Sequence, residues 1–97
     1  MSFQQLGLIG CGLMGGSFAL AAKRAGLVQK VLGFSPSPSS VQKALDMGVI
    51  DQAAKSAAQA VQGSDLVLLA LPVAATQATL ALIRPALDST TLVMDVG

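Results

Sequence analysis

The fold of this chain is decided by the stretch Gly10-Cys11-Gly12-Leu13-Met14-Gly15, which has the pattern G-x-G-x-x-G. The stretch follows a short apolar run at residues 6–9 and precedes an alanine-rich segment. In such a pattern the first glycine makes a tight turn at a strand end, and the second lets a pyrophosphate approach the backbone. The third glycine lets the helix pack closely on the strand. Backbone N–H groups at the helix N-terminus then receive the anion without a lysine. The stretch therefore predicts a dinucleotide-binding turn.

Strands and helices are expected to alternate along the rest of the chain. Apolar runs bounded by glycine or proline predict strands at residues 6–10, 30–34, 65–71 and 90–95, with a short further strand within 49–55. Helices are expected at residues 15–25, 39–47, 56–63 and 73–84, the second and third beginning with Ser-x-x-Gln capping boxes at Ser39 and Ser56. This order predicts the α/β class: a Rossmann-type doubly wound parallel sheet of about five strands, with helices on both faces.

The composition excludes several classes of protein. A length of 97 residues predicts one domain, and 53% hydrophobic with 11% charged residues excludes intrinsic disorder. A net charge of +1 without a basic run gives no electrostatic surface for nucleic acid. A single cysteine excludes an internal disulfide, and no metal site is expected. The chain lacks His, Glu and Tyr, so it offers few general acids or bases, and Cys11 has no histidine to activate it. No catalytic residue is assigned within these residues.

Two long uncharged stretches, residues 3–22 and 66–83, call for a test against membrane insertion. The first is rich in glycine and lacks the basic start of a signal peptide. The second is broken by Pro72 and diluted by polar residues, and it divides into a strand and a helix. A membrane segment is therefore not expected, and the chain is predicted to be soluble and cytoplasmic.

Ser35 occupies the position that distinguishes the two nicotinamide dinucleotides. An acidic residue about 20 positions after the last glycine bonds the ribose 2′-hydroxyl of NAD, and that count from Gly15 reaches Ser35. An uncharged residue there does not repel a 2′-phosphate, and the hydroxyls of Ser35 and Ser37, on either side of Pro36, are suited to bond it. No arginine or lysine lies within residues 31–42 to clamp that phosphate. NADP is favoured, NAD is the alternative, and these serines are otherwise caps for the next helix.

The turn Leu71-Pro72-Val73 follows the strand predicted at residues 65–71. Because ligands of open α/β sheets lie across the carboxyl ends of the strands, we expect this turn to line the cofactor groove. Asp95 ends the last predicted strand at the same edge, near the expected nicotinamide, unless it only caps a loop. Other charged residues, including Asp51, Asp88 and Lys55, are expected to be solvated surface groups.

Several segments resemble a known family. They are Leu8-Ile9-Gly10-Cys11-Gly12-Leu13-Met14-Gly15-Gly16-Ser17, Lys23-Arg24-Ala25-Gly26-Leu27, Ala44-Leu45-Asp46-Met47-Gly48-Val49-Ile50-Asp51, Ser64-Asp65-Leu66-Val67-Leu68-Leu69-Ala70-Leu71-Pro72-Val73 and Met94-Asp95-Val96-Gly97. Together they resemble the start of the prephenate/arogenate dehydrogenase family of tyrosine biosynthesis. The glycine turn is shared with many dehydrogenases, so residues 48–51 and 95–97 favour this family most.

The resemblance implies oxidative decarboxylation of prephenate or arogenate, with hydride transfer to the nicotinamide. It implies cofactor contacts at residues 10–15, Ser35, Pro72 and Val73. Family members that prefer NAD usually have Asp at the position of Ser35, and many that prefer NADP have Arg at the position of Pro36. With the residues inferred from position, the candidate cofactor-binding set is Gly10, Cys11, Gly12, Leu13, Met14, Gly15, Ser35, Pro36, Ser37, Leu71, Pro72 and Val73.

The family also implies a further domain. Its members continue beyond the residue corresponding to Gly97 into a Ser/Lys segment, a catalytic histidine and a helical domain that binds the substrate and dimerises. Residues 1–97 are therefore expected to be a dinucleotide-binding domain that is inactive alone. Homodimer formation is expected only with the helical domain, and neither nucleic acid nor membrane is expected as a partner.

Two other interpretations stay open at the level of the sequence. One is a beta-hydroxyacid dehydrogenase of the hydroxyisobutyrate type, although those proteins usually have Asn at the position of Leu13 and Asn-Arg at the positions of Ser35 and Pro36. The other is a regulatory module that senses NAD(H) without chemistry, which fits the scarcity of acid and base groups.

Overall fold

The computed structural model describes residues 3–10 and 13–95. Its elements are β1 (Phe3–Ile9), α1 (Leu13–Arg24), β2 (Val28–Phe34), α2 (Pro38–Asp46), β3 (Gln52–Ala53), α3 (Ala57–Val61), β4 (Leu66–Leu69), α4 (Val73–Ile83), the 3-10 helix η1 (Arg84–Ala86) and β5 (Leu92–Asp95). Strands and helices alternate throughout, which confirms the predicted α/β class.

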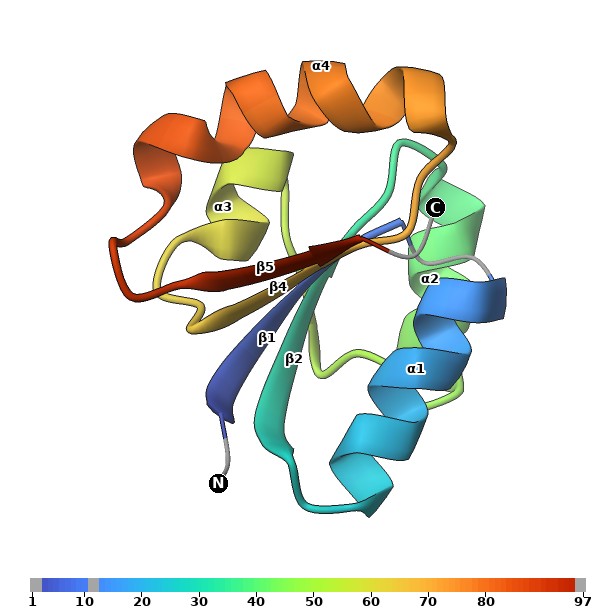
Figure 1. The fold of residues 1–97 in the computed structure, drawn as a ribbon. Helices are drawn as coiled ribbons and strands as arrows, with labels where there is room; N and C mark the ends of the chain where they lie inside the picture. Colours follow the sequence, from blue (N-terminus) through green and yellow to red (C-terminus); the bar gives the residue numbers. More distant parts are fainter. Residues whose placement is uncertain (1–2, 11–12, 96–97) are drawn as a thin grey trace.

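The sheet has five strands in the order β3-β2-β1-β4-β5, and all of the strand pairs are parallel. β1 lies at the centre, between β2 and β4. Helices α1 and α2 cover one face of the sheet, and α3 and α4 cover the other (Figure 1). This strand order reverses direction beside β1, as in a doubly wound Rossmann fold. The predicted architecture is confirmed.

The hydrophobic core is divided by the sheet into two clusters. Leu6 and Leu8 of β1 pack with Ala19 and Ala22 of α1, while Ile9 faces the opposite cluster. That second cluster contains residues of α3, β4 and the end of α4, namely Ala57, Ala60, Val61, Val67, Leu69 and Ile83. Burial on both faces explains why residues 6–9 of β1 and the whole of β4 have continuous apolar sequences rather than alternating ones.

The helix starts differ in part from prediction. α2 begins at Pro38 with Ser37 as N-cap, so the capping box predicted at Ser39 is wrong. Proline is favoured in the first turn because its missing N–H would have no partner there. The box at Ser56 is confirmed, since its Oγ accepts from Gln59 N at 3.0 Å. The Gln59 side chain accepts from the N–H of Lys55 rather than from that of Ser56.

Several element boundaries also move. α1 begins at Leu13, two positions before the predicted start, and so includes part of the glycine motif. β4 and β5 are shorter than predicted, and Asp65 lies just before β4. α4 ends at Ile83 and continues as η1, which contains Pro85, a residue without the N–H that an α-helix requires. Across residues 3–10 and 13–95, no helix combines the length and hydropathy that a membrane span requires.

Candidate functional site

The carboxyl ends of the parallel strands meet at one edge of the sheet. Gly10 N donates to Phe34 O at 2.8 Å, and Ala70 N donates to Ile9 O at 2.8 Å. The end of β1 is thereby fixed between the ends of β2 and β4. The predicted site residues Gly10, Ser35 and Leu71 follow these three strands, so the structure brings them to the same edge.

Gly10 makes the turn that the sequence predicts. Its φ is +93°, a conformation that residues with a Cβ rarely adopt. A Cβ at this position would also collide with the carbonyl oxygen of Ala70, which follows β4. The backbone therefore turns sharply at the end of β1 and stays in contact with the neighbouring strand.

Gly15 brings α1 close to the sheet. A Cβ on Gly15 would lie 2.7 Å from Gly10 O and 2.7 Å from Ala70 Cβ, so no side chain fits. The next residue differs, because a Cβ on Gly16 would lie 3.6 Å from Val49 Cγ1, an ordinary contact. The close packing predicted for the third glycine of the motif is thus confirmed.

The structure describes only part of the middle of the glycine motif. Cys11 and Gly12 lie outside the described residues, so their predicted contacts with a pyrophosphate stay predictions. The backbone of Leu13 and Met14 forms the beginning of α1. The first turn of α1 has no acidic residue, and its last turn has Lys23 and Arg24. Because the first turn has no acidic side chain, the positive end of the helix dipole is free to attract an anion.

A group of hydroxyls lies where β2 gives way to α2. Ser37 N donates to Ser35 Oγ at 3.2 Å, and Ser37 Oγ lies 3.0 Å from Ser39 Oγ. Ser37 is the N-cap of α2, yet its side chain makes no capping hydrogen bond. Pro36 is exposed beside it. Ser39 was not predicted for this group, although the repeated serines of the sequence could have indicated it.

The turn after β4 leads directly into α4. Pro72 is the N-cap of α4, and Val73 begins the helix. Leu71 is half-buried and Pro72 is exposed at the edge. The buried Thr76 donates from Oγ1 to Pro72 O at 3.1 Å and thereby secures the turn. In the sequence, Thr76 is only one of the polar residues within the uncharged stretch 66–83, so this role could not be predicted.

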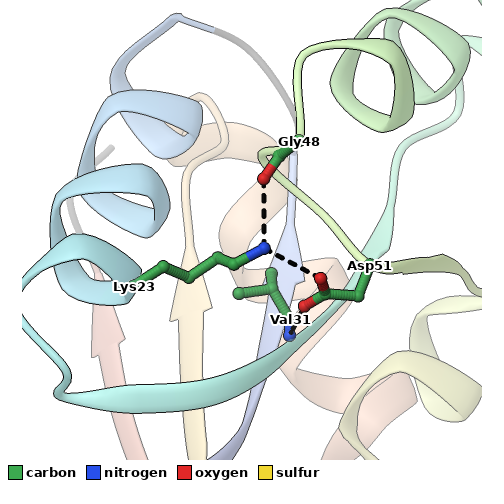
Figure 2. Close-up of polar contacts among 4 residues, drawn as sticks. All are labelled: Lys23, Val31, Gly48 and Asp51. Carbon is green, nitrogen blue, oxygen red and sulfur yellow. Dashed lines mark hydrogen bonds and ion pairs between the residues drawn. The ribbon is translucent and has the colours of Figure 1, made fainter.

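Asp51 is exposed, as predicted, but it also bonds to two neighbouring segments. Its Oδ1 lies 2.8 Å from Lys23 Nζ, and its Oδ2 accepts from Val31 N at 2.8 Å (Figure 2). Burial raises the pKa of Asp51, but the hydrogen bonds from Lys23 and Val31 and the charges of Lys23 and Lys30 outweigh it and lower the pKa. The strand pairs bring these groups together across a long sequence separation, which is why the local sequence gave no signal.

Three other charged residues, Asp95, Lys55 and Asp88, are exposed. Asp95 is exposed at the end of β5, on the edge where the other site residues lie. Lys55 and Asp88 are exposed, as predicted. Among the described residues, no group of three or more potential ligands is placed to hold a metal ion.

A family model described as "Prephenate dehydrogenase, nucleotide-binding domain" matches residues 18–97. The chain belongs to this family. The match confirms the resemblance inferred from the sequence, and it identifies the chain as a nucleotide-binding domain of the prephenate/arogenate dehydrogenase type. A 3-hydroxyisobutyrate dehydrogenase from Mycobacterium tuberculosis, of the type named as the alternative, is also similar in structure, with a TM-score of 0.83 at 26% identity over 98% of this chain and 31% of that one.

The relatives of this chain are considerably longer than the chain itself. Prephenate dehydrogenase of Bacillus subtilis is 36% identical over 91 residues, which are 93% of this chain and 24% of the relative. The structure of the Aquifex aeolicus enzyme with hydroxyphenyl propionate and NAD+ has a TM-score of 0.87 at 32% identity, over 98% of this chain and 34% of that one. Arogenate dehydrogenase of Synechocystis has a TM-score of 0.86 at 29% identity, over 97% and 33%. The chain thus spans about a third or less of these relatives.

Proposed function

We propose that this chain binds the nicotinamide dinucleotide of a dehydrogenase that oxidatively decarboxylates prephenate or arogenate. The observation that carries the proposal is the contact of Gly10 with Gly15, which closes a G-x-G-x-x-G turn between β1 and α1. This is the geometry in which a backbone turn and a helix N-terminus receive a pyrophosphate. The NAD+ held by the Aquifex relative supports the same class of ligand.

The dinucleotide lies across the carboxyl edge in this proposal. Its pyrophosphate sits on residues 10–15, and its adenosine ribose lies beside Ser35, Pro36 and Ser37. The turn Leu71-Pro72-Val73 lines the groove on the other side of β1, toward the nicotinamide. The support for this arrangement is that the structure places the described members of the set after adjacent strands β2, β1 and β4.

We propose NADP as the preferred dinucleotide. No residue within 35–39 carries a negative charge, so nothing in this segment repels a 2′-phosphate. The hydroxyls of Ser37 and Ser39 pair with each other, and that of Ser35 accepts from Ser37 N, at the N-terminus of α2, whose dipole favours an anion. An arginine clamp is missing from the segment, which limits the preference for NADP over NAD to a modest one.

The catalytic groups are supplied from outside this chain in the proposal. The sequence has no histidine, glutamate or tyrosine, so proton transfer to or from the substrate lacks the usual side chains. A helical domain of the longer relatives' kind would supply a histidine, the binding site for prephenate or arogenate, and the dimer contact. In this proposal the chain alone therefore binds the cofactor without turnover. The complete enzyme is proposed to act in the cytoplasm.

Calorimetric titration of the chain with NADP and with NAD tests this function. We expect saturable binding of both dinucleotides, tighter for NADP, and no reduction of either cofactor when prephenate or arogenate is added. A folded chain that binds neither dinucleotide would overturn the binding function. Steady-state reduction of the cofactor by the chain alone would overturn the assignment of the chemistry to another domain.

A further inference from the structure

One segment, residues 48–51, connects α1 to the neighbouring strand β2. Lys23, in the last turn of α1, donates from Nζ to Gly48 O at 3.1 Å and to Asp51 Oδ1 at 2.8 Å. Asp51 Oδ2 in turn accepts from Val31 N at 2.8 Å, and Asp51 N donates to Val31 O at 2.8 Å. Figure 2 shows the Lys23 ammonium reaching from the helix to both the loop carbonyl and the carboxylate.

The same segment also touches the beginning of α1. The Cγ atoms of Val49 lie 3.6 and 3.9 Å from the position of a Cβ on Gly16, near the glycine turn. Val49 and Ile50 are buried in the same core cluster as Ala19 and Ala22 of α1. Residues 48–51 therefore contact α1 near both of its ends and also bond to β2.

Helix α1 and strand β2 lie beside different parts of the proposed ligand. α1 carries the pyrophosphate-binding turn at its N-terminus, and β2 ends at Phe34, directly before Ser35. The distance between the pyrophosphate and the ribose of one ADP group is limited to a narrow range by the few covalent bonds that join them. A ligand that occupies both places therefore requires α1 and β2 to stand within that range, because affinity is lost when ligand or protein must first be reordered.

We propose that Lys23 and Asp51 are positioning residues for the ADP half of the dinucleotide. Their ion pair holds α1 against β2, so that the glycine turn and Ser35 stand at the spacing of one ADP group. The inference rests on the proposed function, because it assumes that the ligand spans these two elements. Neither side chain touches the ligand.

The exposure of the pair favours positioning over bulk stability. The Lys23 and Asp51 side chains are 23% and 41% exposed, and ion pairs of this kind contribute only about 0–1 kcal/mol to folding. Their particular effect is to link three segments, because a single carboxylate receives both the helix ammonium and a strand N–H. Lys30 of β2 adds a second positive charge near Asp51 but makes no hydrogen bond to it in the described contacts.

The test compares a ligand that spans both places with one that occupies a single place. ADP and inorganic pyrophosphate are titrated into the unsubstituted chain, Lys23→Met, Lys23→Arg and Arg24→Met. Arg24→Met removes an exposed positive charge from the same helix turn and is the matched control. We expect Lys23→Met to weaken ADP binding about three- to fivefold, a loss of about 0.6–1.0 kcal/mol. We expect pyrophosphate binding to change less than about twofold, Lys23→Arg to restore ADP affinity, and Arg24→Met to behave like the unsubstituted chain.

Asp51→Asn is measured alongside because it removes the charge of the pair while keeping an oxygen for Val31. It is expected to show the same selective loss of ADP affinity. Equal weakening of ADP and pyrophosphate in Lys23→Met and Asp51→Asn would overturn the positioning role, as would unchanged ADP binding in both. Failure of the folded, unsubstituted chain to bind ADP, pyrophosphate or a dinucleotide would overturn the proposed function itself, and this inference with it.

Discussion

The carbonyl oxygen of Gly10 lies 2.7 Å from the place where a Cβ on Gly15 would stand. The two ends of the glycine motif are therefore in contact, with no room for even a methyl group between them. This contact sets α1 directly against the ends of β1 and β4, since Ala70 Cβ is equally close to the same point. The first turn of α1 is thereby placed at the edge of the sheet where the ligand is proposed to bind.

Gly15→Ala is expected to destabilise the fold and to weaken dinucleotide binding. The added methyl group meets backbone at Gly10, which has little freedom to move, so we expect a loss of about 1–3 kcal/mol in the free energy of unfolding. Gly16→Ala is the matched control, because its methyl group fits beside Val49 and alanine is favoured over glycine in a helix by about 1 kcal/mol. Chemical denaturation of both variants measures the difference. Equal effects of the two substitutions would show that the contact at Gly15 is not tight.

Asp65 is expected to contribute stability that is lost in acid. Its carboxylate accepts from Gln4 N and Gln5 N at 2.9 Å each, and so joins the start of β1 to the residue before β4. Burial raises the pKa of Asp65, but the hydrogen bonds from the N–H groups of Gln5 and Gln4 outweigh it and lower the pKa. A lowered folded pKa means that the stabilisation is complete above the unfolded value of about 3.9 and disappears as the pH falls through the folded value.

Denaturation of Asp65→Asn and of the unsubstituted chain, at neutral pH and near pH 2, tests this contribution. We expect the variant to be less stable at neutral pH by about 1–2 kcal/mol, because one N–H loses its acceptor and the other keeps only a neutral one. The two proteins should converge in acid. Asp46→Asn, at an exposed carboxylate that accepts from the Gln42 side chain, is the control and should change neutral stability by less than about 0.5 kcal/mol. A constant difference between Asp65→Asn and the unsubstituted chain at every pH would refute the titration argument.

Local patterns were sufficient to predict the architecture. The glycine motif between an apolar run and a helix predicted β1 and α1, and alternation of apolar runs with helices predicted the parallel sheet. The predicted start of α2 was wrong because two helix-start signals compete there. The helix begins at the proline at position 38 and not with a capping box at Ser39. The candidate site residues were predicted from motif spacing at residues 10–15 and 35–37 and from the end of a predicted strand at residues 71–73, which are also local properties.

Contacts between distant segments could not be predicted in the same way. Lys23 and Asp51 are 28 positions apart, and Asp65 is 61 positions from Gln4. Each of these carboxylates looked like an ordinary surface or strand-end charge in the sequence. Their partners are backbone N–H groups and a lysine that only the strand order brings near, so the fold had to be known first.

Ser35→Asp is expected to shift cofactor preference toward NAD. A carboxylate at this position repels a 2′-phosphate and accepts hydrogen bonds from ribose hydroxyls instead. We expect the shift to come mostly from weaker NADP binding, because a charge-assisted hydrogen bond contributes about 1.5–3 kcal/mol at best. The gain for NAD should therefore stay within about a hundredfold.

Dissociation constants for NAD and NADP on Ser35→Asp measure this shift. Ser89→Asp is the control, because it adds the same charge in the segment before β5, at the opposite edge of the sheet. It should leave the ratio of the two constants unchanged. NADP affinity that is equal in Ser35→Asp and the unsubstituted chain would mean that Ser35 does not face the 2′ position.

The central claim, that a dinucleotide lies on the glycine turn, is tested most directly by the dissociation constant of NADP for the Gly12→Val chain. A valine side chain would occupy the space that the pyrophosphate needs in a turn of this pattern. Calorimetry should detect NADP binding to the unsubstituted chain and none to Gly12→Val. Denaturation should show that the two differ by less than about 1 kcal/mol in the free energy of unfolding. Unchanged NADP affinity in a folded Gly12→Val chain would contradict the account, because the ligand would then bind elsewhere.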